Sequence, residues 1–166
     1  MNFEDITELL TEKFGADVIE AAELPGLQPA LHIKPALITA VCKELRDNAN
    51  TYFDFLACLS GVDYGVEESK FGVVYHLTSI PFKTSVTLKV SKKHGRSNDS
   101  LPSFLSVSSV WRAADWYERE AYDLLGISFE NHPDLRRILL PDDWVGHPLR
   151  RDYVNLEYYK GIKVDT

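Results

Sequence analysis

The sequence predicts an α+β fold in which two helices cover a small mixed β-sheet, followed by a third helix and an extended C-terminal segment. Two segments with apolar residues at helical spacing, 3–14 and 35–48, are separated by short apolar segments typical of strands. Three more strand-like segments then follow in succession. Beyond residue 113, one strongly periodic helix precedes a stretch that is interrupted by prolines.

The first half begins with a predicted helix, because apolar residues recur at helical spacing until Gly15 ends the pattern. The repeating residues are Phe3, Ile6, Leu9, Leu10 and Phe14. Residues 18–24 and 30–33 are then predicted to form two short strands, with Pro25-Gly26 as the turn between them.

A second helix is predicted to start with Pro35, which suits a first helical turn, and to end near Asn48. Its inner face is predicted to carry Leu37, Val41, Cys42 and Leu45. Three strands follow over 52–62, 71–78 and 84–90, and Pro81 lies in the turn between the last two. The third strand alternates Val86, Leu88 and Val90, as in a sheet with one buried face.

Residues 92–102 are polar and contain Gly, Asn, Asp and Ser, which is typical of a loop or a partial boundary. We therefore divide the chain into an α+β domain over 1–97 and a second part over 98–166. The second part holds the third helix and the extended segment, and we expect the two parts to form one structural unit.

The clearest predicted helix covers residues 113–125, with an apolar stripe of Ala114, Tyr117, Ala121 and Leu124. Gly126 stands where a left-handed C-terminal cap is expected. Arg119 has Asp115 four residues before it and Asp123 four residues after it, so we expect it to pair with either. Beyond Gly126, the spacing of Pro133, Pro141 and Pro148 predicts an irregular path over a neighbour.

The bulk composition limits the classes of protein. A chain of 166 residues with 45% hydrophobic and 26% charged residues is typical of one soluble domain. Its net charge of −7 argues against nucleic acid binding. No run approaches the roughly 20 apolar residues of a membrane span, and the acidic start does not resemble a secretion signal. We expect a cytoplasmic protein, or one on the cytoplasmic side of a larger assembly.

The two cysteines, Cys42 and Cys58, lack the spacing of a redox or metal motif and are expected to be reduced core residues. An iron–sulfur cluster usually needs four cysteine ligands. One chain with two cysteines therefore cannot build such a cluster.

Arginine and tryptophan concentrate in one region of the chain. Six of the eight arginines and all three tryptophans lie between Trp111 and Arg151, whereas no lysine occurs between Lys93 and Lys160. Arginine pairs bidentately and tolerates burial, and both residue types are enriched at the centres of interfaces. The pattern predicts that another molecule covers this region, with Trp111, Trp116 and Trp144 partly interfacial.

The densest group of functional side chains admits two interpretations. It comprises Glu118, Arg119, Glu120, Asp123, His132 and His147. One interpretation is a metal or acid–base site, although the histidines lack the spacing of a helical zinc motif. The other is a set of ion pairs and caps that order the C-terminal segment. His132-Pro133 and His147-Pro148 leave a similar choice between a duplicated docking device and two ordinary turns.

Three segments carry a resemblance to a known family. They are DWYEREAYDLLGI at 115–127, HPDLRRIL at 132–139 and GHPLRRD at 146–152. The chain resembles the 30 kDa subunit of respiratory complex I, the proton-pumping NADH–quinone oxidoreductase. The signature covers about 111–153. Leu125, Asn131 and Arg151 depart from the phenylalanine, glycine and lysine that are common in the family.

The resemblance implies a cofactor-free subunit of the peripheral arm, with no catalytic, cofactor-binding or metal-binding residue of its own. It implies that FMN and iron–sulfur clusters belong to partner subunits. The chief partner would be the hydrogenase-like large subunit that borders the quinone cavity, on the cytoplasmic side of the bacterial inner membrane. Membrane contact would be made only through the complex.

The resemblance also implies which residues form the interface. Trp116, Glu118, Arg119, Glu120 and Asp123 would order the signature helix and its contacts. A second set, His132, Asp134, Arg136, Arg137, His147, Arg150, Arg151 and Asp152, would hold the tail on the partner. Arg136 and Arg150 are expected to be buried paired charges there. Residues from about 128 onward are expected to be loosely held without the partner.

Two other readings stay open at this point. The first is the equivalent subunit of a membrane-bound nickel–iron hydrogenase or of a ferredoxin-fed relative, since those complexes share this module. The second is a free-standing metal-dependent enzyme that uses Glu120, Asp123, His132 and His147 as ligands.

Overall fold

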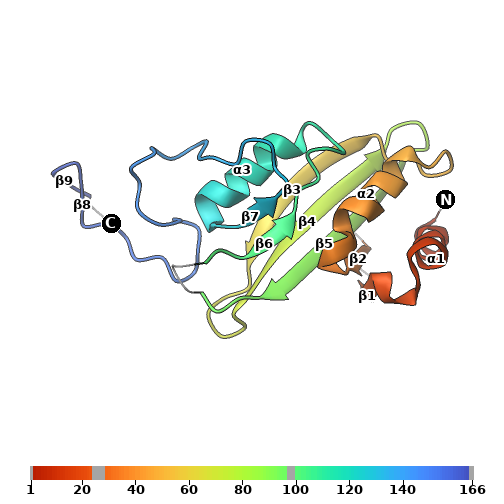
Figure 1. The fold of residues 1–166 in the computed structure, drawn as a ribbon, viewed down its shortest axis with the longest axis horizontal. Helices are drawn as coiled ribbons and strands as arrows, with labels where there is room; N and C mark the ends of the chain where they lie inside the picture. Colours follow the sequence, from red (N-terminus) through yellow and green to blue (C-terminus); the bar gives the residue numbers. More distant parts are fainter. Residues whose placement is uncertain (1, 24–28, 97–99, 165–166) are drawn as a thin grey trace.

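The computed structural model describes residues 2–23, 29–96 and 100–164 and has the predicted α+β architecture (Figure 1). The helices are α1 (Phe3–Phe14), α2 (Ile38–Asp47) and α3 (Ala114–Leu125), with short 3-10 turns η1 (Ala16–Val18) and η2 (Pro35–Leu37). The strands are β1 (Ile19–Glu23), β2 (Ala30–Ile33), β3 (Phe55–Asp63), β4 (Lys70–Ser79), β5 (Thr84–Lys93), β6 (Ser103–Leu105), β7 (Ser128–Glu130), β8 (Tyr158–Tyr159) and β9 (Ile162–Lys163).

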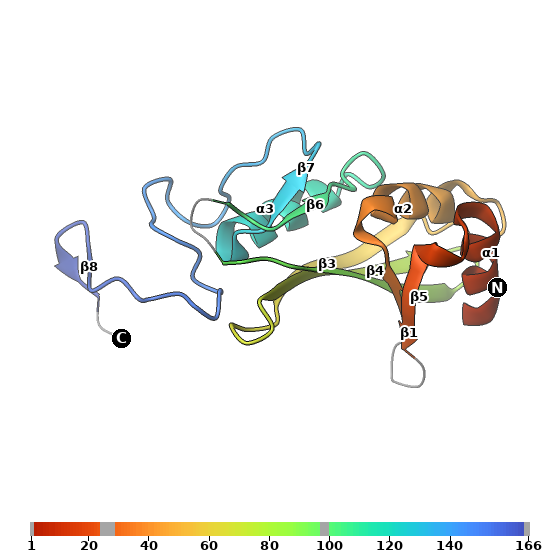
Figure 2. The same ribbon diagram turned by 60° about the horizontal axis from the view of Figure 1, so that its bottom comes forward.

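Strands β1 to β5 form one sheet in the order β1-β2-β5-β4-β3. Strands β2 and β5 are parallel, with Leu31 opposite Leu88, and the other neighbours in this sheet are antiparallel. The prediction of a mixed sheet is therefore confirmed. Helices α2 and α3 lie on the same face of the sheet, whereas α1 stands at its β1 side (Figure 2).

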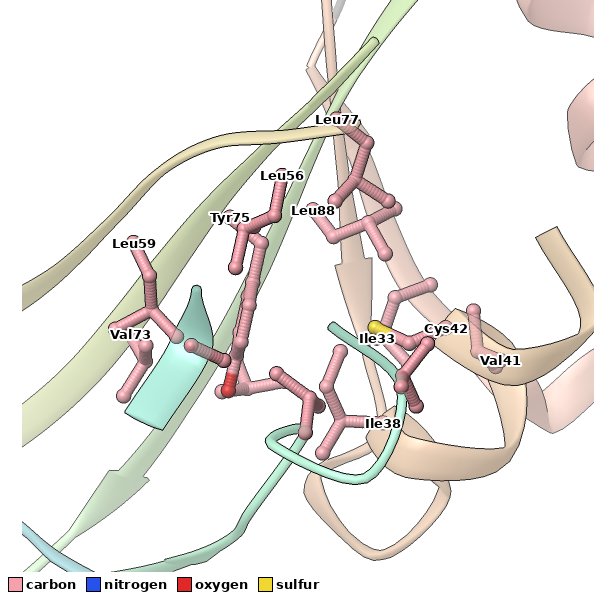
Figure 3. Packing of buried hydrophobic residues seen from close by; sticks show 14 of the residues in the cluster. Ile33, Ile38, Val41, Cys42, Leu56, Leu59, Val73, Tyr75, Leu77 and Leu88 are labelled. Carbon is pink, nitrogen blue, oxygen red and sulfur yellow. The ribbon is translucent and has the colours of Figure 1, made fainter. Parts of the chain in front are cut away.

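The hydrophobic core fills the space between α2 and this face of the sheet. Figure 3 shows Ile38 and Cys42 of α2 close to Ile33 of β2, and all three are fully buried. Val86, Leu88 and Val90 of β5 are buried, as the alternation predicts, although Thr87 on the opposite face is buried as well. Trp111, Ala121 and Ile127 belong to the same core as the first hundred residues. The division at residue 97 stays an interpretation of the sequence.

The predicted helix boundaries agree with local hydrogen bonding. Asn2 and Asp5 form a capping box at the start of α1, with each side chain accepting from the other's backbone N–H at 2.8 Å. Gly15 ends α1 with φ 89°, a value that suits glycine. Pro35 opens the η2 turn that leads into α2, and Asn48 caps the end of α2.

Two strand boundaries differ from the prediction. Strand β3 begins at Phe55, because Tyr52 adopts φ 39° and donates its backbone N–H to the Asn48 carbonyl, which forms a turn after α2. Strand β5 continues to Lys93, so the start of the predicted loop is still paired with β4. The predicted turn at Pro25-Gly26 lies outside the described residues.

The expectation of a wholly irregular path beyond Gly126 is wrong for Ser128–Glu130 and for the short antiparallel pair of β8 and β9. Ser128–Glu130 forms β7, which pairs in parallel with β6. Three residues are too few to give a readable period, so the sequence could not reveal the pair. Within the described ranges, none of the helices is long and apolar enough to cross a membrane.

Candidate functional site

The candidate site is built on helix α3, which lies directly against β3. A Cβ atom on Gly61 would come within 2.8 Å of Leu125 Cδ1 and 2.9 Å of Ile127 Cδ1, so glycine permits the close approach. Gly126 has φ 66° and ψ 36° and ends α3 with the predicted left-handed cap. From there the chain returns across α3 as residues 131–164, which we call the strap and which is irregular apart from the short β8–β9 pair near its end.

Glu118 is the buried carboxyl group of α3. Its side chain accepts from Ser106 Oγ at 2.6 Å and from the Val107 backbone N–H at 2.7 Å, so it fixes the chain that follows β6. Burial raises the pKa of Glu118 to about 7 and the Asp115 charge adds to the increase, although the two hydrogen bonds oppose it. His132 Nε2 lies 3.9 Å from the same carboxyl group.

His132 fastens the start of the strap to the first turn of α3. Its Nδ1 accepts the Asp134 backbone N–H at 3.0 Å, which leaves Nε2 as the protonated nitrogen. Nε2 then donates to the Asp115 carbonyl at 3.2 Å. Both ring nitrogens are satisfied by the backbone, and the side chain is fully buried. Asn131, just before His132, adopts φ 65°, which asparagine tolerates.

Asp123 holds the middle of the strap. Its Oδ2 accepts the backbone N–H groups of Ile138, Leu139 and Leu140 at 3.0, 2.8 and 2.8 Å, and its Oδ1 accepts from Arg137 Nη1 at 2.6 Å. The side chain is fully buried. Burial acts to raise the pKa of Asp123, but the bonds from the Leu140 amide, Arg137 and the other amides outweigh it and hold the pKa below its ordinary value.

Two arginines extend this attachment through main-chain carbonyl groups. Arg137 Nη2 donates to the carbonyls of Trp144 and Gly146 at 3.0 and 3.1 Å. Arg119 donates to the carbonyls of Arg136 and Arg137 at 3.2 and 3.0 Å. The predicted pairing of Arg119 with Asp115 or Asp123 is not seen among the described residues. The oxygens of Asp123 already accept hydrogen bonds from backbone amides and Arg137.

His147 fastens the strap to the other end of α3. Its Nδ1 donates to the Asp123 carbonyl at 2.9 Å, and burial lowers its pKa more than this bond raises it. The ring lies over Gly126, where a Cβ atom would come within 2.5 Å of His147 Cδ2. The two His-Pro units therefore do form a repeated device, but in this structure each one docks on the chain's own α3.

A second charged cluster joins the strap to the sheet at the end of β3. Asp63, the last residue of β3, forms an ion pair with Arg96 and accepts the backbone N–H groups of Gly65 and Arg151 at 2.8 and 2.9 Å. Burial acts to raise the pKa of Asp63, but the bonds from Arg96, Arg151 and Gly65 lower it to about 2.

Arg150 lies within this cluster and is buried. It pairs with Asp152 at 2.8 and 2.9 Å, and its guanidinium lies 5.3 Å from the centre of the Phe71 ring. Arg96 lies 4.7 Å from the same ring and 3.3 Å from the Asp152 carboxylate. Intramolecular bonds thus attach the strap to α3 and to the sheet through residue 152. The expectation that residues from about 128 onward are loosely held without the partner stays a prediction.

The predicted interface residues divide between the interior and the surface of the chain. Those turned inward or half-buried are Glu118, Arg119, Asp123, His132, Arg137, His147 and Arg150, and those on the surface are Trp116, Glu120, Asp134, Arg136, Arg151 and Asp152. Arg136 is a surface residue whose side chain is 70% exposed and pairs with Asp134. The expected burial of Arg136 against a partner stays a prediction, whereas the buried pair of Arg150 with Asp152 lies within this chain.

The three tryptophans have three different environments. Trp111 is a core residue whose Nε1 donates to the Phe53 carbonyl at 3.1 Å. Trp116 is 65% exposed on α3. Trp144 is half-buried, with its ring centre 5.1 Å from that of Tyr159.

The four residues of the proposed metal site do not converge. His132 lies at the first turn of α3 and His147 at its last, and the Asp123 oxygens are occupied by N–H donors. Across the described ranges, no group of three or more His, Cys, Asp or Glu side chains could hold a metal ion. Asp123, His132 and His147 instead serve as hydrogen-bonded clamps on the strap, and Glu120 lies on the surface.

Sequence reasoning missed several residues of this site. Three of them belong to the first hundred residues and contact the strap where it returns to the end of the sheet: Asp63, Phe71 and Arg96. Ser106 satisfies the buried Glu118 from outside the signature. No local spacing links these residues to their partners, since Asp63 and Arg151 are 88 positions apart.

These features define a small α+β scaffold that fixes an extended strap by buried polar clamps and leaves apolar strap side chains exposed. The comparison with known families agrees with this class of protein. Residues 31–159 match the family described as "Respiratory-chain NADH dehydrogenase, 30 Kd subunit". The chain belongs to this family, and the resemblance found in the signature segments is confirmed.

Three relatives are named as subunits of NADH-quinone oxidoreductase, each designated by the letter C. The protein from Chloroherpeton thalassium is 44% identical over 94% of this chain and 62% of its own length. The one from Salinispora tropica is 40% identical over 98% of this chain and 66% of its own length. The one from Geotalea uraniireducens is 41% identical over 92% of this chain and 90% of its own length. The chain thus spans less than two thirds of the first two relatives and most of the third.

A solved structure has the same fold. It is a chain of the membrane-bound sulfane sulfur reductase, an archaeal respiratory membrane complex, with a TM-score of 0.73 and 23% identity. The match covers 93% of this chain and 87% of that chain. At this level of identity, the comparison concerns the fold alone.

Proposed function

We propose that this chain is a cofactor-free, structural subunit of the peripheral arm of NADH–quinone oxidoreductase, respiratory complex I. The complex would transfer electrons from NADH to quinone and couple this to proton translocation, with FMN and iron–sulfur clusters in partner subunits. The chain would lie beside the hydrogenase-like large subunit that borders the quinone cavity, on the cytoplasmic side of the bacterial inner membrane. Its own part would be assembly, without catalytic residues.

The structural observation that carries the docking part of this proposal is the apolar surface of the strap. Large apolar side chains between 57 and 81% exposed recur along it: Leu139, Val145, Leu149, Val154, Tyr158 and Ile162. Burying such a side chain fully contributes about 1.5–3 kcal/mol. An irregular segment that exposes several of them is suited to an interface with a partner.

The clamps on α3 support the same function. Because Asp123, His132, His147 and Arg150 fix the strap through residue 152, much of its surface is already ordered before a partner arrives. Preorganisation reduces the conformational entropy that is lost on binding. The signature residues would therefore act mainly by shaping the strap, and Trp116 and Arg136 on the surface would contact the partner directly.

The hydrogenase reading is less favoured. Relatives that are 40–44% identical over most of this chain carry the name of the NADH–quinone oxidoreductase. No specific observation on this chain favours the hydrogenase-type complex over that assignment.

A pull-down with mild detergent from native membranes tests the proposal. Tagged wild-type chain is expected to recover flavin- and cluster-bearing NADH dehydrogenase subunits, as read by mass spectrometry. The double variant Val145→Asp/Val154→Asp is expected to lose the large subunit, since both side chains are exposed strap residues.

The matched control is Val66→Asp/Ile80→Asp, which places the same charges on exposed aliphatic positions in the turns of the sheet. Circular dichroism checks that each variant folds. Recovery of hydrogenase subunits would move the chain to the sister complexes. Wild-type recovery of the large subunit by the strap variant would refute the docking role of the strap.

A further inference from the structure

Residues of α1 and β1 line a shallow groove. Figures 1 and 2 show these two elements at the end of the molecule opposite to the strap. The groove is open to solvent, has a volume of about 360 Å³ and has largely apolar walls. It is lined by Phe3, Thr7, Thr11 and three glutamates of α1, together with Ala22 of β1. None of the clamps described above contacts this groove.

The threonines contribute apolar surface in spite of their hydroxyl groups. Thr7 Oγ1 donates to the Phe3 carbonyl at 2.9 Å, and Thr11 Oγ1 donates to the Thr7 carbonyl at 2.8 Å. Both hydroxyls are therefore satisfied within α1, and each side chain retains a methyl group for contact. A partner in the groove would meet carbon surface without leaving a hydroxyl group unpaired.

The rim of the groove carries one sign of charge. Glu4, Glu8 and Glu12 repeat every four residues, so they form a single row along α1. No salt bridge involves any of the three in the part of the chain that the structure describes. Residues 2–23 contain seven acidic side chains and a single basic one, Lys13, which pairs with Glu44.

Like charges four residues apart destabilise a helix, so the row is unfavourable in the free chain. A cationic partner would replace the repulsion among the three glutamates by attraction to its own positive charges. We propose that the groove binds an amphipathic, lysine- or arginine-bearing segment of another subunit. From Glu4 to Glu12 the row spans about 12 Å, which matches two to three helical turns with basic residues beside an apolar ridge.

Zero-length carbodiimide cross-linking of the native membrane complex tests this inference directly. The expected products join Glu8 or Glu12 to lysines in one segment of a different polypeptide, identified by mass spectrometry. If both carboxyl groups instead react with glycine ethyl ester as readily in the complex as in the isolated chain, the groove is empty and the inference fails. Cross-links between two copies of this chain would also overturn it.

Charge variants supply the second arm. Glu8→Lys/Glu12→Lys is expected to abolish the cross-linked product and to lower recovery of that polypeptide at least tenfold. Glu8→Gln/Glu12→Gln keeps a similar helix propensity but removes the negative charges. It introduces no repulsion, so it is expected to lower recovery of the partner polypeptide less than the lysine variant does. Glu67→Lys/Glu68→Lys, on an exposed turn, makes the same change in net charge elsewhere and is expected to recover the partner normally.

Unchanged recovery by the Lys variant would refute the charge complementarity. The strap variants probe the opposite end of the molecule. If the α1 variant loses its cross-linked polypeptide and still recovers the large subunit, or the strap variant does the reverse, the groove and the strap act as separate contacts. The two proposals can therefore fail independently.

Discussion

Asp123→Asn tests the main structural interpretation, that a buried carboxylate holds the strap on α3. Asparagine has nearly the same shape but only one side-chain oxygen. The Asp123 carboxylate accepts four N–H groups, three on Oδ2 and one from Arg137 on Oδ1. In the variant, an NH₂ group must face either the backbone amides or the guanidinium, so at least one donor is left opposite another donor.

The expected size of the effect follows from the burial. The Asp123 side chain is fully buried and that of Arg137 is 17% exposed. Removing one partner of a buried charge pair destabilises by about 3–5 kcal/mol. Because the strap contributes no strand to the five-stranded sheet, we expect most of this loss to be local. A local loss of about 3–4 kcal/mol corresponds to a fall of roughly 10²–10³-fold in hydrogen-exchange protection.

The assay is hydrogen exchange on the Ile138, Leu139 and Leu140 amides, with urea denaturation for global stability. Protection of these three amides is expected to collapse, while that of the β4 amides changes little. Asp134→Asn is the control, since its exposed pair with Arg136 contributes little. If the three amides of Asp123→Asn keep wild-type protection, the carboxylate does not hold the strap.

Gly126→Ala is expected to lower the free energy of unfolding by about 2 kcal/mol, because φ is 66° and the new Cβ would lie 2.5 Å from His147 Cδ2. Thermal unfolding measures this loss, with Gly95→Ala as the control because nothing lies within 4 Å of a Cβ there. Glu118→Gln is expected to remove a pH dependence. The folded pKa of Glu118, about 7, lies above its ordinary 4.5, so its contribution is full below pH 4.5 and is lost as the pH rises through 7, by about 3 kcal/mol in total. Asp63→Asn acts in the opposite direction: the folded pKa of about 2 lies below 3.8, so the stability that Asp63 provides is present above pH 3.8 and is lost as the pH falls through 2.

Urea denaturation from pH 2 to pH 8 separates the last two effects. The Glu118 variant should lose its slope between pH 4.5 and 7 relative to wild type, and the Asp63 variant should lose its slope below pH 4. A wild-type profile from the Glu118 variant would mean that this carboxyl group does not take up a proton on folding. Equal melting temperatures for the two glycine variants would show that His147 does not need the space at Gly126.

Local patterns determined the elements of this protein. Apolar spacing located α1 and α3, alternation identified the buried face of β5, and Gly126 marked the end of α3, because each of these depends on residues within a few positions of one another. The signature segments identified the family for a related reason, since a long run of specific residues needs no knowledge of their contacts.

The tertiary structure decided what the charged residues do. Glu118 and Glu120 are two positions apart on a helix, so their spacing predicts opposite faces. Only the packing decided that Glu118 is the one buried beneath the chain after β6 and that Glu120 faces solvent. Asp123 is satisfied by backbone amides, which every residue except proline possesses and which no spacing can distinguish. Asp63 and Arg151 meet only because the strap returns to the end of the sheet. An irregular segment has no period, so its path, and with it the partners of each buried charge, is fixed by the packing of the whole chain.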